Sequence, residues 1–306
     1  MSDSSIPRSR FILGFSMALF GAICFSAKAI FAKLAYRHEP IDAISVLALR
    51  MIFSIPFYLV TAIWLYSRPG NQRLTAKQWG YILVLGFMGY YLSSILDFMG
   101  LQYISAGLER LILFLYPTFS LLMAAVFFKK KITKLQWSAL GLAYIGMLIA
   151  FYGDIQTQAI SRELIIGSLL VLGCAITYAF YIVGGGEVIP QVGSMKFTAY
   201  ALTFSSIGVF AHYMLKHGIH FPQATTHVYW LCAMMAIIST VIPTFLMSEG
   251  IRMIGAGNTA IITSVGPVAT IAMAYFFLGE EVNVPQVFGT ILVLAGVVLI
   301  GKKGKA

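Results

Sequence analysis

Residues 96–150 read LDFMGLQYISAGLERLILFLYPTFSLLMAAVFFKKKITKLQWSALGLAYIGMLIA, and residues 246–300 align with them without a gap at a shift of 150 positions. Thirteen of these 55 aligned positions are identical. The identical pairs include Gly100/Gly250, Ala106/Ala256, Gly107/Gly257, Pro117/Pro267, Phe127/Phe277, Gln136/Gln286 and Gly146/Gly296. Glycine and proline impose special backbone requirements, so their coincidence indicates an internal repeat rather than chance similarity of apolar segments.

A weaker match, at a shift of 153 positions, relates the beginning of the chain to its middle. It pairs Gly14 with Gly167, Ala22-Ile23 with Ala175-Ile176, and Phe25 with Tyr178. Together the two matches predict two repeats, which we place at residues 11–153 and 164–301.

The composition identifies the class of protein. Of the 306 residues, 59% are apolar and 10% are charged, and the mean hydropathy is +0.86. A soluble domain carries about 25% charged residues, and a disordered chain is poor in apolar ones. The composition therefore excludes water-soluble enzymes, nucleic-acid-binding proteins and secreted disulfide scaffolds. It predicts a polytopic membrane protein.

Ten apolar runs are long enough to be membrane spans, since a helix needs about 20 mostly apolar residues to cross the hydrocarbon core. They lie near residues 11–36, 43–66, 78–100, 104–128, 135–153, 164–186, 195–215, 227–250, 256–278 and 284–301. Helices are expected because unpaired backbone groups are costly in lipid. We therefore predict an all-α polytopic membrane protein with five helices in each repeat.

Five spans per repeat require the second repeat to be inverted in the membrane, because five is odd. With the N-terminus inside, 14 of the 21 Lys and Arg residues fall on the inner side and three on the outer side. This distribution obeys the positive-inside rule and predicts cytoplasmic N- and C-termini. In the alignment, Lys129-Lys130-Lys131 stands opposite Gly279-Glu280-Glu281, as expected for loops on opposite faces.

Inverted repeats suit a carrier, because two related halves can exchange conformations and open a central site to each side in turn. Pro117 and Pro267 lie within the fourth and ninth predicted spans at aligned positions. Proline interrupts helical hydrogen bonding, so both residues are candidate hinges. A static kink is the alternative.

The end of the second repeat resembles a known family. The residues that carry the resemblance are Gly266-Pro267, Phe276-Phe277-Leu278-Gly279-Glu280, Gln286, Gly289 and Gly296-Val297. They are similar to the end of an EamA-type repeat, of the drug/metabolite transporter superfamily, and the resemblance covers nearly the whole chain. The first repeat keeps Pro117 and Phe127 but has lysines in place of the Gly-Glu pair, so that pair is not essential in both repeats.

The resemblance implies a secondary transporter in the bacterial inner membrane. Family members move small organic metabolites, often exporting amino acids or their derivatives with proton or gradient coupling. No cofactor is implied. The expected partners are a small-molecule substrate and membrane lipid, without nucleic acid, and the protein is a monomer or a homodimer.

Charge within a membrane span is expensive and usually functional, and five of the charged residues within the predicted spans are site candidates. They are Lys28, Arg50, Asp97, Glu109 and Arg110, all in the outer half of the first repeat. At about 1.5 Å per residue, Lys28 and Arg50 are the deeper pair, roughly 12 and 10 Å from the outer ends of their spans. These two cations are candidates for binding a substrate carboxylate, and Asp97 or Glu109 for carrying a coupling proton. An internal ion-pair network, or snorkelling of the side chains to the lipid headgroups, is the alternative for all five.

Tyrosines within spans are candidates to line a solute cavity, chiefly Tyr178 and Tyr181, with Tyr90, Tyr91 and Tyr200 beside them. Packing between helices, with each hydroxyl satisfied by a neighbour, is the alternative. The three cysteines and five histidines have no metal-ligand spacing, so no metal site is predicted.

Two other functional classes were weighed against a secondary transporter. The first is a channel or a subunit of a membrane complex. The second is a membrane-embedded enzyme, which the sequence disfavours because it contains neither G-x-S-x-G nor H-E-x-x-H.

Overall fold

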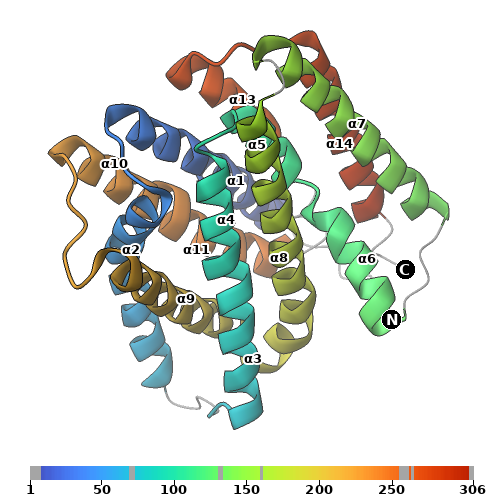
Figure 1. Ribbon diagram of the computed structural model, residues 1–306. Helices are drawn as coiled ribbons and strands as arrows, with labels where there is room; N and C mark the ends of the chain where they lie inside the picture. The colour runs from blue at the N-terminus through green and yellow to red at the C-terminus, as the bar shows by residue number, and fades with distance from the viewer. Residues whose placement is uncertain are drawn as a thin grey trace.

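A computed structural model describes residues 8–68, 73–129, 134–158, 161–254, 262 and 265–302, and it is helical throughout (Figure 1). The first repeat comprises α1 (Arg8–His38), α2 (Ala43–Tyr66), α3 (Ala76–Gly86), η1 (Phe87–Leu92), α4 (Ser93–Gly100), α5 (Ala106–Leu113), α6 (Tyr116–Phe128) and α7 (Lys134–Gln158). The second comprises α8 (Arg162–Val192), α9 (Ser194–His217), α10 (Thr226–Ala236), η2 (Ile237–Val241), α11 (Ile242–Ile254), α13 (Gly266–Met273), η3 (Ala274–Leu278) and α14 (Val284–Lys302).

The helices have the lengths and composition of membrane spans. Within the described part of the chain, six stretches are long and apolar enough to cross a bilayer, and three shorter apolar helices accompany them. The six are Phe11–His38, Ala43–Tyr66, Ala76–Gly100, Ala106–Phe127, Arg162–Val192 and Thr226–Met247. The predicted sixth span, 164–186, is too short, since α8 continues to Val192. Of the predicted ninth span, 256–278, residues 256–261 and 263–264 lie outside the described residues.

Residues that are aligned in the two repeats make equivalent contacts across the interface between the repeats. Gly14 of α1 packs on Ile254, where an added Cβ would lie 2.7 Å from the Ile254 Cγ2 atom. Gly167 of α8 packs in the same way on Ile104, also at 2.7 Å from Cγ2. The two contacts are related by the shifts of 153 and 150 found in the sequence. Helix α1 on α11 and helix α8 on α4 are therefore equivalent interfaces.

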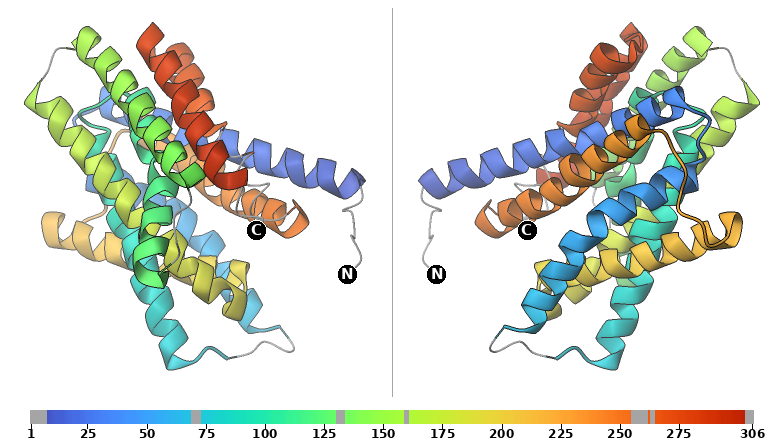
Figure 2. Two further views of the ribbon diagram at one scale, coloured as in Figure 1. Left: turned by 90° about the vertical axis from the view of Figure 1, so that its right-hand side faces the viewer. Right: turned by 90° about the vertical axis from the view of Figure 1, so that its left-hand side faces the viewer.

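Helices α7 and α14, the last of each repeat, pack side by side along their length (Figure 2). Gly146 approaches Gly289 at the middle of the pair, and Gly153 approaches Asn283 at one end. Because residue numbers rise along α7 as they fall along α14, the two equivalent helices are antiparallel. This is the geometry of inverted repeats, and the small residues let the backbones come close.

Two spans contain a π-helical turn at aligned positions. Segment η1 begins at Phe87 and segment η2 begins at Ile237, 150 residues later. In a π-helix the hydrogen bonds skip to the fifth residue, which widens the helix locally and redirects side chains. Such turns are frequent at functional sites, so the middle of the third and eighth spans is a candidate functional region.

The two aligned prolines both begin a helical segment. Pro117 lies in the first turn of α6, directly after the break that separates α6 from α5. Pro267 lies in the first turn of α13. Proline is well tolerated there, because the first amides of a helix have no internal acceptor. The segmentation at these prolines is a structural fact, and hinge motion remains a prediction.

Candidate functional site

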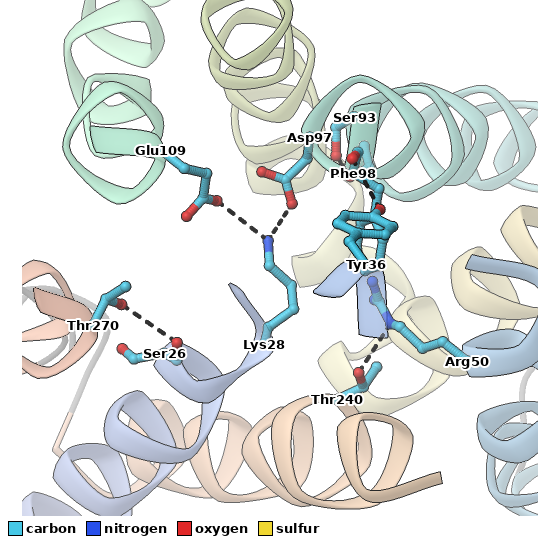
Figure 3. A network of polar contacts seen from close by, with 11 residues as sticks. Ser26, Lys28, Tyr36, Arg50, Ser93, Asp97, Phe98, Glu109, Thr240 and Thr270 are labelled. Carbon is cyan, nitrogen blue, oxygen red and sulfur yellow. Dashed lines mark hydrogen bonds and ion pairs between the residues drawn. The ribbon is translucent and has the colours of Figure 1, made fainter. Parts of the chain in front are cut away.

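Three of the charged residues predicted within spans meet in one cluster (Figure 3). The Lys28 ammonium forms an ion pair with the Asp97 carboxylate and lies 3.6 Å from Oε1 of Glu109. Lys28 comes from α1, Asp97 from α4 and Glu109 from α5, so the cluster ties three helices of the first repeat together. We call Lys28, Asp97 and Glu109 the charge cluster.

All five predicted charges are buried. The exposed fraction is 6% for Lys28, 4% for Arg50, 1% for Asp97, 0% for Glu109 and 7% for Arg110. Removing a charge from water costs several kcal/mol unless partners compensate for it. Three cations and two carboxylates leave one surplus positive charge among these residues.

The local sequence explains how Glu109 is placed. Ser105 caps α5, its hydroxyl accepting the Leu108 amide at 3.1 Å. Glu280, from the second repeat, accepts the Ala106 amide at 3.0 Å and lies 3.4 Å from the Gly107 nitrogen. A carboxylate at a helix N-terminus is favoured by the unpaired amides and the helix dipole. Glu280 therefore holds the start of α5, and with it Glu109, against the other repeat.

Arg50 of α2 bridges to the second repeat. Its Nε donates a hydrogen bond of 3.1 Å to the hydroxyl of Thr240 in η2, and its guanidinium lies 5.4 Å from the centre of the Phe98 ring (Figure 3). Its Nη1 is buried and has no hydrogen-bond partner within the described part of the chain. Arg50 is thus held on one side only.

Arg110 lies next to α13. Its guanidinium is 5.1 Å from the centre of the Phe25 ring, and a Cβ added to Gly266 would lie 2.8 Å from its Nη2. Gly266 is therefore required for the close approach. Over the described ranges, no carboxylate lies within 4.0 Å of the Arg110 side chain.

Serine and threonine hydroxyls join α1 to α13 beside the charges. The Ser26 hydroxyl lies 3.1 Å from the Gly266 carbonyl oxygen, and the Thr270 hydroxyl lies 3.4 Å from the Ser26 carbonyl oxygen. These contacts cross between the repeats two residues from Lys28. Movement of one repeat against the other would therefore reach the charge cluster directly.

The predicted tyrosines Tyr178 and Tyr181 stack on each other with ring centres 5.8 Å apart. The Tyr181 hydroxyl donates to the Tyr90 hydroxyl at 3.3 Å, and the Tyr116 ring meets the Tyr178 ring edge-on. We call Tyr90, Tyr116, Tyr178 and Tyr181 the tyrosine cluster. Tyr91 and Tyr200 lie outside it and contact His212 and Trp79.

At the end of the bundle where α1 leads into α2, Arg37 connects the two repeats and Tyr36 connects α1 to α4 within the first repeat. The Arg37 side chain donates to the Leu278 carbonyl oxygen at 2.5 Å, across the repeats, close to the Glu280 cap. The Tyr36 hydroxyl donates to the Phe98 carbonyl oxygen at 3.0 Å. By contrast, Lys129 lies at the far end of the α5–α6 span, which begins at the Glu280 cap.

Asp42, in the connection between α1 and α2, lies outside the spans. Burial opposes its ionisation, but the Ser45 amide and the neighbouring Lys216 and His217 outweigh burial and hold the pKa of the carboxyl below its ordinary value. The Lys216 Nζ lies 3.2 Å from Oδ2 and the His217 Nε2 lies 2.7 Å from it.

Sequence reasoning named the five charges and three residues of the tyrosine cluster, Tyr90, Tyr178 and Tyr181, but it missed Tyr116, Thr240 and Glu280. Depth along the spans placed all five charges in the outer half of the first repeat, but it set Lys28 with Arg50 and did not single out its contacts with Asp97 and Glu109. Thr240 carried an unused signal, since it aligns with Tyr90 at the shift of 150. The role of Glu280 as a cap on α5 had no local signal, because its partners lie 174 residues away.

Comparison with known proteins identifies this helical framework. The sequence profile of the EamA-like transporter family matches residues 12–152 and again residues 165–302. The chain belongs to the EamA-like transporter family. It is accordingly a multi-pass membrane transporter and not an enzyme.

EamA-like relatives are found in several organisms. The uncharacterized transporter YcbK of Bacillus subtilis (strain 168) is 32% identical over 278 residues, which cover 89% of this chain and 87% of that protein. The uncharacterized transporter sll1319 of Synechocystis is 24% identical over 94% of this chain and 93% of its own length. The uncharacterized inner membrane transporter YicL of Salmonella typhimurium is 19% identical over 94% of each chain.

A solved crystal structure shares the fold of this EamA-like protein. It aligns with 97% of this chain and 99% of its own chain at a TM-score of 0.64. At 13% sequence identity, the likeness supports the fold alone.

Proposed function

We propose that this transporter exports a small organic metabolite, such as an amino acid or a derivative, across the bacterial inner membrane by alternating access. The observation that carries the proposal is the pair of equivalent interfaces, Gly14 on Ile254 and Gly167 on Ile104. Two halves with the same interface can exchange their arrangements at little cost, which converts a structure closed at one end into one closed at the other.

The contacts of Arg37 and Glu280 across the repeats support the assignment of an external gate at the α1–α2 end. On the positive-inside rule this end faces the periplasm, and both termini face the cytoplasm. The described structure then corresponds to a state with its external gate closed. The name of YicL agrees with an inner-membrane location.

The buried charge cluster could couple the conformational exchange between the repeats to the binding of a proton. Lys28, Asp97 and Glu109 form an ionisable group of three side chains beside the Ser26 and Thr270 contacts between repeats. A proton taken up by one of the two carboxylates would change the net charge of the cluster. Coupling of export to the proton gradient is therefore part of the proposal, with Asp97 and Glu109 as the proton carriers.

Counterflow into proteoliposomes tests the proposal. Vesicles with the purified protein are preloaded with one unlabelled solute at millimolar concentration, and uptake of the same labelled solute is followed for a set of amino acids and organic acids. A carrier accelerates uptake of its own solute when preloaded, whereas a pore does not. Absence of acceleration for every solute, with either proton gradient imposed, would contradict alternating-access transport.

A further inference from the structure

Arg50 is a buried cation that forms no ion pair with a carboxylate in the described protein, and the Asp97 carboxylate acts on it only from beyond 4.0 Å. Its exposed fraction is 4%, and within the described ranges no carboxylate lies within 4.0 Å of its guanidinium. Asp97 is paired with Lys28. A buried guanidinium without a charge partner is unfavourable, and it is retained where something else supplies the negative charge.

The free part of the guanidinium is defined by its contacts. The Nε is occupied by the Thr240 hydroxyl and one face lies over the Phe98 ring. The Nη1 is buried and has no hydrogen-bond partner among the residues that the structure places. An arriving acceptor therefore meets a fixed, oriented N–H donor, which is how guanidinium groups recognise carboxylates.

Two tyrosines, Tyr58 of α2 and Tyr90 of η1, lie beyond Arg50, and we call them the aromatic wall. Tyr58 lies two helical turns further on along the same face of α2 and is 1% exposed. It packs in one apolar cluster with Tyr90, Leu202 and Val241. A small, mostly apolar pocket between α2, α9 and α11 is lined by Tyr58 and by Thr61, Thr198 and Thr244.

The two π-helical turns frame this region from both repeats. Thr240 of η2 holds Arg50, and Tyr90 of η1 contacts both Tyr58 and Tyr181. Thr240 and Tyr90 occupy aligned positions at the shift of 150. The cation and the aromatic wall are thus presented by equivalent turns of the two repeats, at the interface that alternating access would rearrange.

We propose that Arg50 binds the carboxylate of the transported solute, and that Tyr58 and Tyr90 contact its apolar or aromatic body. The substrate class is a small organic monocarboxylate. A single buried Nη1 donor without a partner suits one carboxylate oxygen, whereas a phosphate dianion would bring a second negative charge that Arg50 alone does not match. This proposal rests on the proposed transport function and specifies its solute.

Binding measured on the purified full-length protein tests the assignment. The probes are N-acetyl-phenylalanine, N-acetyl-leucine and 3-phenylpropionate, each beside its primary amide, with phenyl phosphate as the dianionic arm. Thermal unfolding and calorimetry report the affinities, because a ligand stabilises the state that it binds. At least one carboxylate is expected to bind, with its amide and phenyl phosphate each at least tenfold weaker.

Variants connect the preference to Arg50. Arg50→Met is expected to weaken carboxylate binding by about tenfold to hundredfold, the range for a charge-assisted hydrogen bond, and to leave amide binding unchanged. Arg50→Lys keeps the charge and guards against misfolding, and it is expected to retain part of the preference. Arg162→Met removes an exposed arginine and serves as the matched control.

Three outcomes would overturn the assignment: no carboxylate binds the wild-type protein, acids and amides bind equally, or Arg50→Met keeps the preference for the acid. The counterflow assay separates this failure from failure of the transport function. Counterflow of a neutral or cationic solute without carboxylate binding would remove the subsite and leave the carrier. Carboxylate binding without counterflow of the bound acid would support the Arg50 subsite and contradict the proposed transport function.

Discussion

Lys28 and Tyr181 occupy aligned positions of α1 and α8, at the shift of 153, yet their surroundings differ completely. Lys28 lies between the carboxylates of Asp97 and Glu109, whereas Tyr181 lies among the rings of the tyrosine cluster. The backbone of the two repeats is equivalent at these points, as the contacts of Gly14 and Gly167 show. The two repeats therefore share a backbone framework but carry different chemistry at these aligned positions.

The charge cluster and the tyrosine cluster lie toward opposite ends of the helical bundle. The charge cluster lies nearer the α1–α2 end, and the tyrosine cluster lies toward the end where α8 leads into α9. A solute passing between the repeats would meet ionised groups at one end and aromatic rings at the other.

The charge cluster is broken most severely by Lys28→Met. The substitution leaves Asp97 and Glu109 buried without their cation, and removing one partner of a buried ion pair costs about 3–5 kcal/mol. Unfolding in mixed micelles of increasing SDS content measures the loss of stability. The triple variant Lys28→Met/Asp97→Asn/Glu109→Gln has no buried charge left unpaired in this cluster and is expected to recover most of it. A single variant as stable as wild type would show that the cluster is not ion-paired.

The tyrosine cluster is disrupted by a substitution that overpacks it, because it is held by ring packing and not by ion pairs. Gly89 of η1 lies directly against Tyr181, and a Cβ at Gly89 would overlap the Tyr181 side chain. Gly89→Ala is expected to cost about 1–3 kcal/mol, the usual range for overpacking. Gly80→Ala is the control, since its added Cβ has no neighbour within 4 Å and alanine favours a helix by up to about 1 kcal/mol. Equal effects of the two variants in the same SDS titration would contradict the close approach.

The variant Tyr181→Phe measures how much the hydrogen bond between Tyr181 and Tyr90 contributes to stability. This variant keeps the stacked ring and removes the hydroxyl that donates to Tyr90. The expected cost is about 0.5–1.5 kcal/mol, the net worth of a hydrogen bond in folding. Tyr178→Phe removes a hydroxyl from the neighbouring stacked ring and provides the comparison. A loss as large as that of Lys28→Met would mean that the tyrosine cluster also holds charge.

Asp42 provides a reference at the membrane surface, where the smallest effect is expected. Its pKa is lower in the folded protein than its ordinary value, so its contribution to stability is present above pH of about 4 and is lost as the pH falls through the folded value. Thermal unfolding of wild type and Asp42→Asn between pH 3 and 7 measures this. The difference between them should shrink at acid pH, and a constant difference would rule out the contribution.

Much of this architecture was predictable because membrane folds are restricted. Hydropathy located the spans, and the aligned Gly and Pro residues located the repeats. Depth along the spans predicted that five charges share the outer half of the first repeat, but not that Lys28 meets Asp97 and Glu109 while Arg50 lies apart. The π-helical turns had no such signal, because a shift in hydrogen bonding by one residue leaves the composition unchanged. The pairing of Arg50 with Thr240 joins residues 190 positions apart and depends on packing between the repeats.

The central claim, that two inverted five-helix repeats face each other in the bilayer, is tested most directly by sidedness. In a variant lacking Cys24, Cys174 and Cys232, single cysteines replace the exposed Lys129 or the exposed Glu281. A membrane-impermeant maleimide is then added to intact cells and to permeabilised cells. We predict that Glu281→Cys is labelled in intact cells and Lys129→Cys only after permeabilisation. Labelling of both cysteines from the same side would contradict the inverted arrangement.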